Sequence, residues 1–281
     1  MDIVDAQVHF NLIGDLEAGL AVMDAVGVKA LVYDEWWGFD EKYRLTPGYN
    51  MPNGVFRATN PLAEIAVLKH PDRFAVLSRF DRNDPELDYL MGNFKTLPNR
   101  LAIRIVPWTQ EGFDQFGQGL DEPIFAVAQK YNVPIFVLIP GRTHLLEPYL
   151  KKFPGVQVIV DHCGVPISGT STPVDPFEGF EKVLKLAHYP NVALKWCHAP
   201  LLSSQPYPYP DLLPVLVKVV EAFGPQRVMW ASDHSQSKHH HSWAESLFYI
   251  RDSTEFSETD KEWILGKSVR RVLNWPQPAS K

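Results

Sequence analysis

Short apolar runs alternate with longer stretches of helical spacing along the whole chain. Eight of the runs have the length and composition of strands, at 2–10, 29–35, 73–80, 100–106, 133–139, 156–162, 191–196 and 227–233. The segments between and after them repeat apolar residues at helical spacing, at 16–26, 62–69, 85–94, 123–131, 145–153, 177–187, 212–223 and from 243 onward. The pattern therefore predicts eight strand–helix units.

The expected strands are almost continuously apolar, as in IFVLI and VQVIV, instead of alternating. Such runs are typical of parallel strands that are buried on both faces. Dividing the 281 residues among eight units gives about 35 each, close to the roughly 30 of a strand with its crossover helix. We therefore expect an α/β fold, a (β/α)8 TIM barrel, as a single domain over 1–281. A doubly wound sheet is the alternative, but Gly117 and Gly119 form a lone pair without the rest of a phosphate loop.

One long segment, at about 36–60, separates the second strand from its helix. It is rich in aromatic residues and contains WWGFD and PGYNMPNG. Long loops without secondary structure are commonly functional. We therefore expect this segment to be a lid over the barrel mouth, with packing on the surface as the alternative.

Composition excludes several classes of protein. The chain has 27 Lys and Arg against 33 Asp and Glu, a net charge of −6, so nothing favours nucleic-acid binding. No apolar run approaches the roughly 18 residues of a membrane helix. Two cysteines, Cys163 and Cys197, cannot form a disulfide framework. The start, MDIVDAQVHF, has no basic segment like that of a secretory signal. We expect a cytoplasmic protein, and a homo-oligomer is left open.

Polar residues gather where the expected strands end. In a (β/α)8 barrel the active site lies at the carboxyl ends of the strands, and unpaired polar groups there cost several kcal/mol. Only the fifth run, ending in VLIP, is purely apolar. This gathering of polar residues at the strand ends predicts a reaction site. Its candidates are Gln7, His9, Arg79, Arg104, His162, Lys195, His198, Asp233 and His234, with Asp5, Asp34, Glu35, Asp161 and Ser232 at the same strand ends.

Simpler interpretations stay open for several of these residues. Asp5 could bond only to backbone, and the arginines and Lys195 could form structural ion pairs. Both cysteines are expected to be buried and inert. The run His239–His241 resembles a metal tract, but we place it at the start of the last helix, where consecutive residues point about 100° apart. We therefore expect it to be a solvated face.

Three motifs at the ends of these runs resemble a known family. DAQVH at 5–9, VIVDHCG at 158–164 and MWASDHS at 229–235 are similar to the amidohydrolase superfamily, of the amidohydrolase 2 type. The resemblance is closest to the branch that contains 2-pyrone-4,6-dicarboxylate lactonase. Three further segments extend it from residue 2 to about 275: HPDRFAVLSRFD, SWAESLFYIRD and WILGKSVRRVLNW.

The resemblance implies a metal site that this chain only partly keeps. The family pattern has two histidines on the first strand, one on the fifth, one on the sixth and an aspartate on the eighth. His9, His162 and Asp233 match it, whereas Gln7 replaces the first histidine and the fifth strand has none. Some lactonases of this branch work without metal, and we expect the same here. If a divalent metal such as zinc binds, its ligands are His9, His162 and Asp233.

The chemistry expected from this resemblance is hydrolysis of a lactone or similar cyclic ester by direct attack of water. Asp233 is the expected general base, and His9, His162 and Gln7 donate hydrogen bonds to the carbonyl oxygen. Arg79, Arg104 and Lys195 are expected to hold a small anionic substrate, with His198 and His234 in the pocket wall. Two alternatives are a metal-dependent decarboxylase of an aromatic acid and a catalytically inactive barrel that only binds a ligand.

Overall fold

A computed structural model describes residues 1–281 except 13, 37–46, 97, 167–174, 176 and 278–281. Eight parallel strands form one sheet in the order β1-β2-β5-β6-β7-β8-β9-β10. The edge strands β10 and β1 also meet, because the Asp233 N–H donates to Gln7 O at 3.2 Å. The predicted (β/α)8 barrel is confirmed. Its strands are β1 Ile3–Val8, β2 Val28–Asp34, β5 Phe74–Ser78, β6 Arg100–Ile105, β7 Ile135–Val137, β8 Val158–Val160, β9 Val192–Cys197 and β10 Val228–Ala231.

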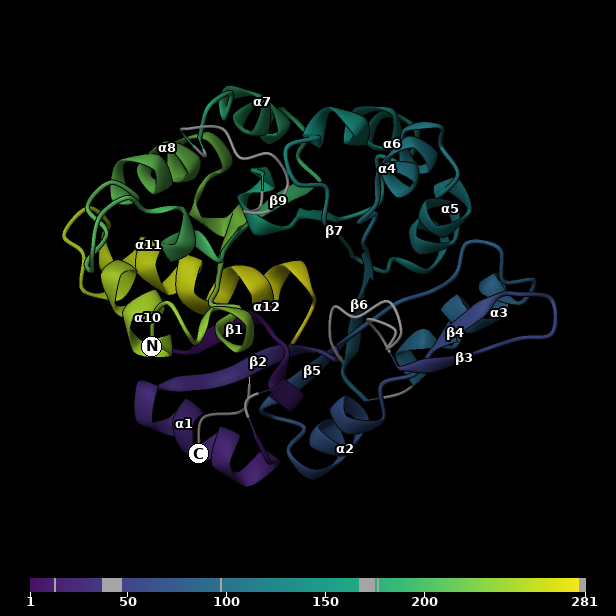
Figure 1. Ribbon diagram of the computed structural model, residues 1–281, viewed down its shortest axis with the longest axis horizontal. Helices are drawn as coiled ribbons and strands as arrows, with labels where there is room; N and C mark the ends of the chain where they lie inside the picture. Colours follow the sequence, from purple (N-terminus) through teal and green to yellow (C-terminus); the bar gives the residue numbers. More distant parts are fainter. Residues whose placement is uncertain (13, 37–46, 97, 167–174, 176, 278–281) are drawn as a thin grey trace.

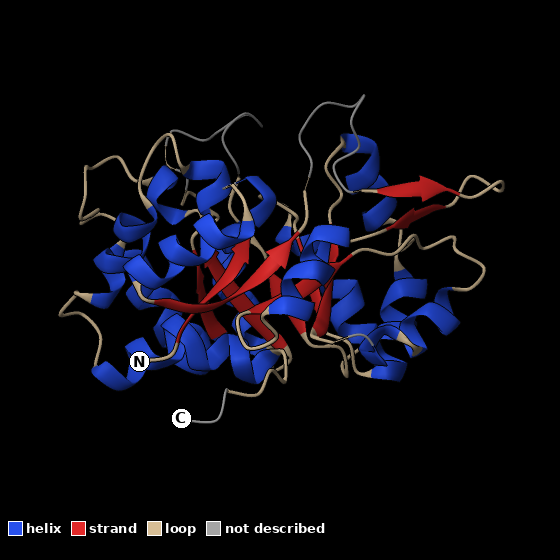
Figure 2. Cartoon of the chain, turned by 90° about the horizontal axis from the view of Figure 1, so that it is seen from below, coloured by secondary structure: helices blue, strands red, loops and turns tan. Residues whose placement is uncertain are grey.

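Helices surround the barrel as an outer layer (Figures 1 and 2). Two short helices, α4 and α9, were not expected from the sequence, and a π-helical turn at Trp263–Lys267 joins α11 to α12. The helices are α1 Leu16–Val26, α2 Pro61–Lys69, α3 Leu87–Gly92, α4 Gln110–Gly117, α5 Glu122–Tyr131, α6 Glu147–Lys152, α7 Glu181–Leu184, α8 Leu213–Phe223, α9 His234–Ser237, α10 Trp243–Arg251, α11 Glu258–Glu262 and α12 Ser268–Val272. None of the described helices is both long and apolar enough to cross a membrane.

Part of the expected lid is a hairpin. Residues 37–46 lie outside the described part of the chain. Beyond them, strands β3 (Gly48–Asn50) and β4 (Phe56–Ala58) pair antiparallel and project from the barrel (Figure 2). Arg57 of β4 bonds to Asp84 at 2.8 Å and holds the hairpin against the loop after β5. The lid function stays a prediction.

Two apolar cores lie on the two faces of the sheet. Large side chains such as Phe74, Phe125 and Trp196 fill the space between strands and helices. The barrel interior holds mostly smaller side chains, among them Ala30, Ala75, Ala102, Ala193 and Ala231. Side chains alternate between the two faces along each strand, so the inner face of each strand can be followed upward from this core into the site.

Candidate active site

The inner face of six strands changes from apolar to charged within two residues. Each pair consists of an interior core residue and the next inward-facing position at the carboxyl end. The pairs are Val32 and Asp34, Leu77 and Arg79, Ala102 and Arg104, Ile159 and Asp161, Ala193 and Lys195, Ala231 and Asp233. On β7 the equivalent pair, Phe136 and Leu138, is wholly apolar. The strand period of two therefore assembles one charged layer above the interior core.

Cations and carboxylates in this layer neutralise one another. Arg104 contacts Asp34 Oδ2 through Nη1 at 2.5 Å and Asp161 Oδ2 through Nε at 2.6 Å. Lys195 Nζ lies 2.6 Å from Asp161 Oδ1. Arg79 Nη2 lies 2.8 Å from Asp34 Oδ1. Burial alone would raise the pKa of Asp34, but the two guanidiniums outweigh it and lower that pKa to about 2.

This network already uses the cations that were expected to bind substrate. Arg104 and Lys195 are almost completely buried, and both contact Asp161. Arg79 differs, because its buried Nη1 has no hydrogen-bond partner within the described chain. Binding of a substrate carboxylate by these three cations stays a prediction, and Arg79 has a nitrogen left for it.

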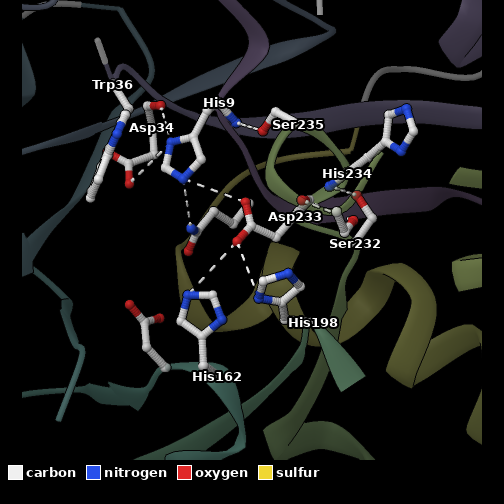
Figure 3. A network of polar contacts seen from close by, with 12 residues as sticks. His9, Asp34, Trp36, His162, His198, Ser232, Asp233, His234 and Ser235 are labelled. Carbon is white, nitrogen blue, oxygen red and sulfur yellow. Dashed lines mark hydrogen bonds and ion pairs between the residues drawn. The ribbon is translucent and has the colours of Figure 1, made fainter. Parts of the chain in front are cut away.

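The His9 ring is oriented by a backbone carbonyl. Its Nδ1 lies 2.8 Å from Asp34 O, which can only accept, so Nδ1 carries a proton. Nε2 faces Asp233 Oδ1 at 3.4 Å (Figure 3). It also lies 3.4 Å from Gln7 Nε2. The Gln7 amide is oriented too, because the Lys195 ammonium can only donate and bonds to Gln7 Oε1.

His9 and Asp233 are placed to share one proton. Burial lowers the pKa of His9 and raises the pKa of Asp233, so it opposes ionisation of each group alone, whereas the charge of each partner favours ionisation of the other. Asp233 Oδ1 is buried without a hydrogen bond from the described residues. A proton on the His9 Nε2 would satisfy it and leave Asp233 as a carboxylate.

His162 has the same Nδ1–H tautomer as His9, fixed by a different partner. Arg104 Nη2 can only donate and lies 3.2 Å from His162 Nε2, so Nε2 accepts and Nδ1 carries the proton. Burial, followed by the charges of Lys195 and Arg104, lowers the pKa of His162 well below its usual value, so the ring is neutral. Its buried Nδ1–H has no partner among the described residues. It is a donor free for a bound molecule.

Two imidazoles flank the other oxygen of Asp233. His162 Nε2 lies 4.0 Å and His198 Nδ1 lies 3.9 Å from Oδ2. Burial lowers the pKa of His198 to about 4. His234 does not join this group, because its ring stacks on Trp243 with centroids 5.3 Å apart and points away from Asp233 (Figure 3). Its place in the pocket wall stays a prediction.

Three residues of the group have strained backbone. The φ angles of His162, His198 and Asp233 are +47°, +63° and +47°. Non-glycine residues rarely adopt this left-handed conformation, and it costs about 1–2 kcal/mol each. Such strain persists where the surrounding structure holds it and is concentrated at functional sites. The strain supports a functional role for this cluster.

Two other polar features lie outside the group. Asp5 shares strand parity with Gln7 and His9, but the β1–β2 register is irregular between Asp5 and Val8. The bulge sends Asp5 toward Trp243, whose Nε1 donates to it at 2.8 Å. The run His239–His241 follows α9 in a turn and not at a helix start. His239 and His240 are exposed, whereas His241 is buried and not solvated as expected.

Comparison with known proteins assigns the chain to a family. The family model described as Amidohydrolase matches residues 42–275. The chain belongs to the amidohydrolase family. The uncharacterized protein y4mH of Sinorhizobium fredii (strain NBRC 101917 / NGR234) is 25% identical to this amidohydrolase over 266 residues, covering 84% of this chain and 86% of that protein.

Solved structures share the fold at lower identity. An amidohydrolase from Burkholderia multivorans with bound zinc has a TM-score of 0.74 at 15% identity, over 98% of this chain and 100% of that one. A candidate 2-pyrone-4,6-dicarboxylic acid hydrolase from Pseudomonas putida has a TM-score of 0.68 at 17% identity, over 97% of each chain. A 2,6-dihydroxybenzoate decarboxylase from Rhizobium has a TM-score of 0.59 at 13% identity, over 98% and 99%.

The donor set of this amidohydrolase does not fit a catalytic metal well. Within the described residues, one group of donors lies close enough, with His162, Cys197 and Asp233 atoms within 4.8 Å of one another. Cys197 takes the place in this group that was expected for His9. Arg104 already occupies the His162 Nε2 lone pair, and burial raises the pKa of the Cys197 thiol well above its usual value. A dication would also join three cations in one buried layer, so no catalytic step is derived through a metal.

Sequence reasoning missed several residues of the site. Asp34 and Asp161 stood at strand ends but were given no role, although they bind the cations of the layer. Their strand position was the available signal. Cys197, which is expected from the sequence to be inert, lies among the site donors. Leu201 and Leu202, which line a cavity beside the site, lie beyond a strand end and had no periodic signal.

Proposed function

We propose that this amidohydrolase hydrolyses a lactone or similar cyclic ester by direct attack of water, with Asp233 as the general base. The observation that carries the proposal is the environment of Asp233. One carboxylate oxygen faces the His9 imidazole at 3.4 Å, and the other faces His198 and His162 at 3.9 and 4.0 Å. A buried carboxylate with imidazoles on both sides is suited to proton transfer.

The proposed reaction uses only groups of the chain and water. With the shared proton on His9, Asp233 takes a proton from water while the water oxygen bonds to the carbonyl carbon. The carbonyl oxygen gains charge and accepts from the His162 Nδ1–H, which has no other partner among the described residues. The bond from that carbon to the ring oxygen then breaks. Asp233 returns its proton to the ring oxygen, which gives an open-chain hydroxy acid.

His9 has a different role here from the one expected. Its Nδ1–H is used by Asp34 O, and Nε2 holds a proton only when it takes one from Asp233. We propose that His9 keeps Asp233 ionised at neutral pH. Lys195 fixes the Gln7 amide with its NH₂ group toward Nε2, so Gln7 donates to Nε2 only while that nitrogen holds no proton.

We propose that a small carboxylated substrate binds Arg79 on the β2–β5 side of the mouth. The spare Nη1 of Arg79 is the matching donor, while Arg104 and Lys195 contribute through their charge. A metal-dependent decarboxylase is the second candidate, because one solved relative in fold is a decarboxylase. The poor metal fit counts against it. The strained, buried Asp233 counts against the third candidate, an inactive barrel that only binds a ligand, because ligand binding alone does not require a base.

A panel of lactones, with and without a carboxylate, tests the proposal by the acid released into a weakly buffered indicator. Release by the wild type, and its loss in Asp233→Asn, is the expected result. Aromatic acids are tested in parallel for CO₂ release. Decarboxylation with no lactone consumed would replace the proposed function by the second candidate.

A further inference from the structure

A cavity of about 120 Å³ opens beside the imidazoles that flank the base. His162 and His198, which flank Asp233, line the cavity together with Cys197. The apolar part of its wall is made of Val165, Pro166, Leu201 and Leu202. The mechanism above uses the two imidazoles but gives the apolar wall no role.

The apolar wall comes from two neighbouring strand ends. Val165 and Pro166 follow the turn after β8, and Leu201 and Leu202 end the 3-10 helix Ala199–Leu202 after β9. β5, which Arg79 directly follows, lies four places from β9 in the order of the barrel. A substrate seated on Asp233 therefore meets a cation on one side of the mouth and hydrocarbon on the other.

The cavity does not suit a charged group. None of the described residues that line it carries a formal charge when its histidines are neutral, and burial lowers the pKa of both imidazoles. The cations Arg104 and Lys195 are bonded to Asp34 and Asp161. A carboxylate placed here would lose its hydration without gaining an ion pair, which is strongly unfavourable.

The size of the cavity sets the size of a suitable group. An apolar cavity of about 150 Å³ is large enough to hold benzene. By proportion, about 120 Å³ accommodates roughly four or five carbons. On the basis of the proposed function, we propose that this cavity is a subsite for an apolar substituent on the lactone ring, an alkyl chain of that length.

Binding of γ-lactams to the wild type tests the subsite without turnover, because a lactam resists hydrolysis. The probes are γ-lactams that carry methyl, ethyl, propyl, butyl or hexyl chains beside the ring nitrogen, measured by calorimetry. We expect affinity to rise about threefold to fourfold per methylene, the gain from full burial, and to level off beyond about butyl. A carboxylate at the chain end should abolish the gain.

Leu201→Asp should remove the dependence on chain length, because it places a charge in the apolar wall. Leu68→Asp is the matched control, since Leu68 is 72% exposed on α2, and it should bind the series like the wild type. Equal affinity along the series, tighter binding of the carboxylated chain, or an unaffected Leu201→Asp would each overturn the subsite.

Parallel hydrolysis of the matching alkyl lactones separates this inference from the function. Lactams that bind by chain length while no lactone is cleaved would keep the subsite and overturn the hydrolase. If the lactones are cleaved with the same kcat/KM whatever the chain length, and the lactams bind with equal affinity, the hydrolase stands and the subsite is overturned. Failure of both arms would overturn both proposals.

Discussion

Replacing Asp5 by Asn tests how the free energy of unfolding depends on pH through Asp5, the buried carboxyl of β1 that bonds to Ser232 after β10. Asp5 is completely buried. It accepts hydrogen bonds from the Ser232 N–H at 3.0 Å and from Trp243 Nε1 at 2.8 Å. Burial raises its pKa from 3.8 to about 6, and these hydrogen bonds only partly oppose the rise. Asn at this position has a similar shape and does not titrate.

The size of the effect follows from the difference in pKa. A shift from 3.8 to about 6 is roughly two units, and each unit is worth about 1.4 kcal/mol, so the effect is about 3 kcal/mol. Because the pKa is higher in the folded state, the stabilisation is complete below about pH 4. It is lost as pH rises through about 6. Wild type should therefore lose about 3 kcal/mol between pH 4 and 7 relative to Asp5→Asn.

Urea unfolding of both proteins at half-unit steps from pH 4 to 7 measures this difference. Equal m-values confirm that the two denatured states are comparable. The two proteins will differ in their absolute free energies of unfolding. The test is therefore how that difference changes with pH. Two stability curves that stay parallel over this range would refute a strongly raised pKa at Asp5.

The remaining predictions concern the charged layer and the base. Arg104→Met leaves Asp34 and Asp161 without their shared cation and should cost about 3–5 kcal/mol of unfolding free energy; a loss below 1 kcal/mol would show that the pairs contribute little. If Arg104 also contacts substrate, KM for a carboxylated lactone rises in the same variant, and an unchanged KM assigns it a structural role. Dialysis against a chelator should leave kcat unchanged, with well under one metal ion per chain; activity that zinc restores would contradict a metal-free reaction. Because burial raises the pKa of Asp233, kcat/KM should fall on acidification with a midpoint above 3.8, and a midpoint at or below 3.8 would contradict an Asp233 base.

The barrel and its charged layer could be predicted because both follow from local periodicity. Continuous apolar runs marked the strands, and a period of two fixed which residue comes next on the inner face, as in Asp34 and Asp233. The same rule failed at Asp5, because a bulge adds one residue to β1 between Asp5 and Val8. Parity holds only while the register is regular.

Features that depend on long-range contacts could not be read from the sequence. Nothing local indicates that Arg104 bonds both Asp34 and Asp161, which lie far apart along the chain. The tautomers of His9 and His162 depend on which partner each ring nitrogen meets. The hairpin β3–β4 consists of two three-residue strands, too short to give a periodic signal. The cavity wall at Leu201 is likewise formed by a loop.

Turnover of a lactone by the wild type and by Asp233→Asn tests the central claim most directly. Asn tolerates the left-handed backbone of this position, so the variant should fold, and unfolding in urea checks that it does. We predict that kcat falls by a factor of about 10² or more, the contribution typical of a general base. A folded Asp233→Asn variant with the turnover of the wild type would contradict the account.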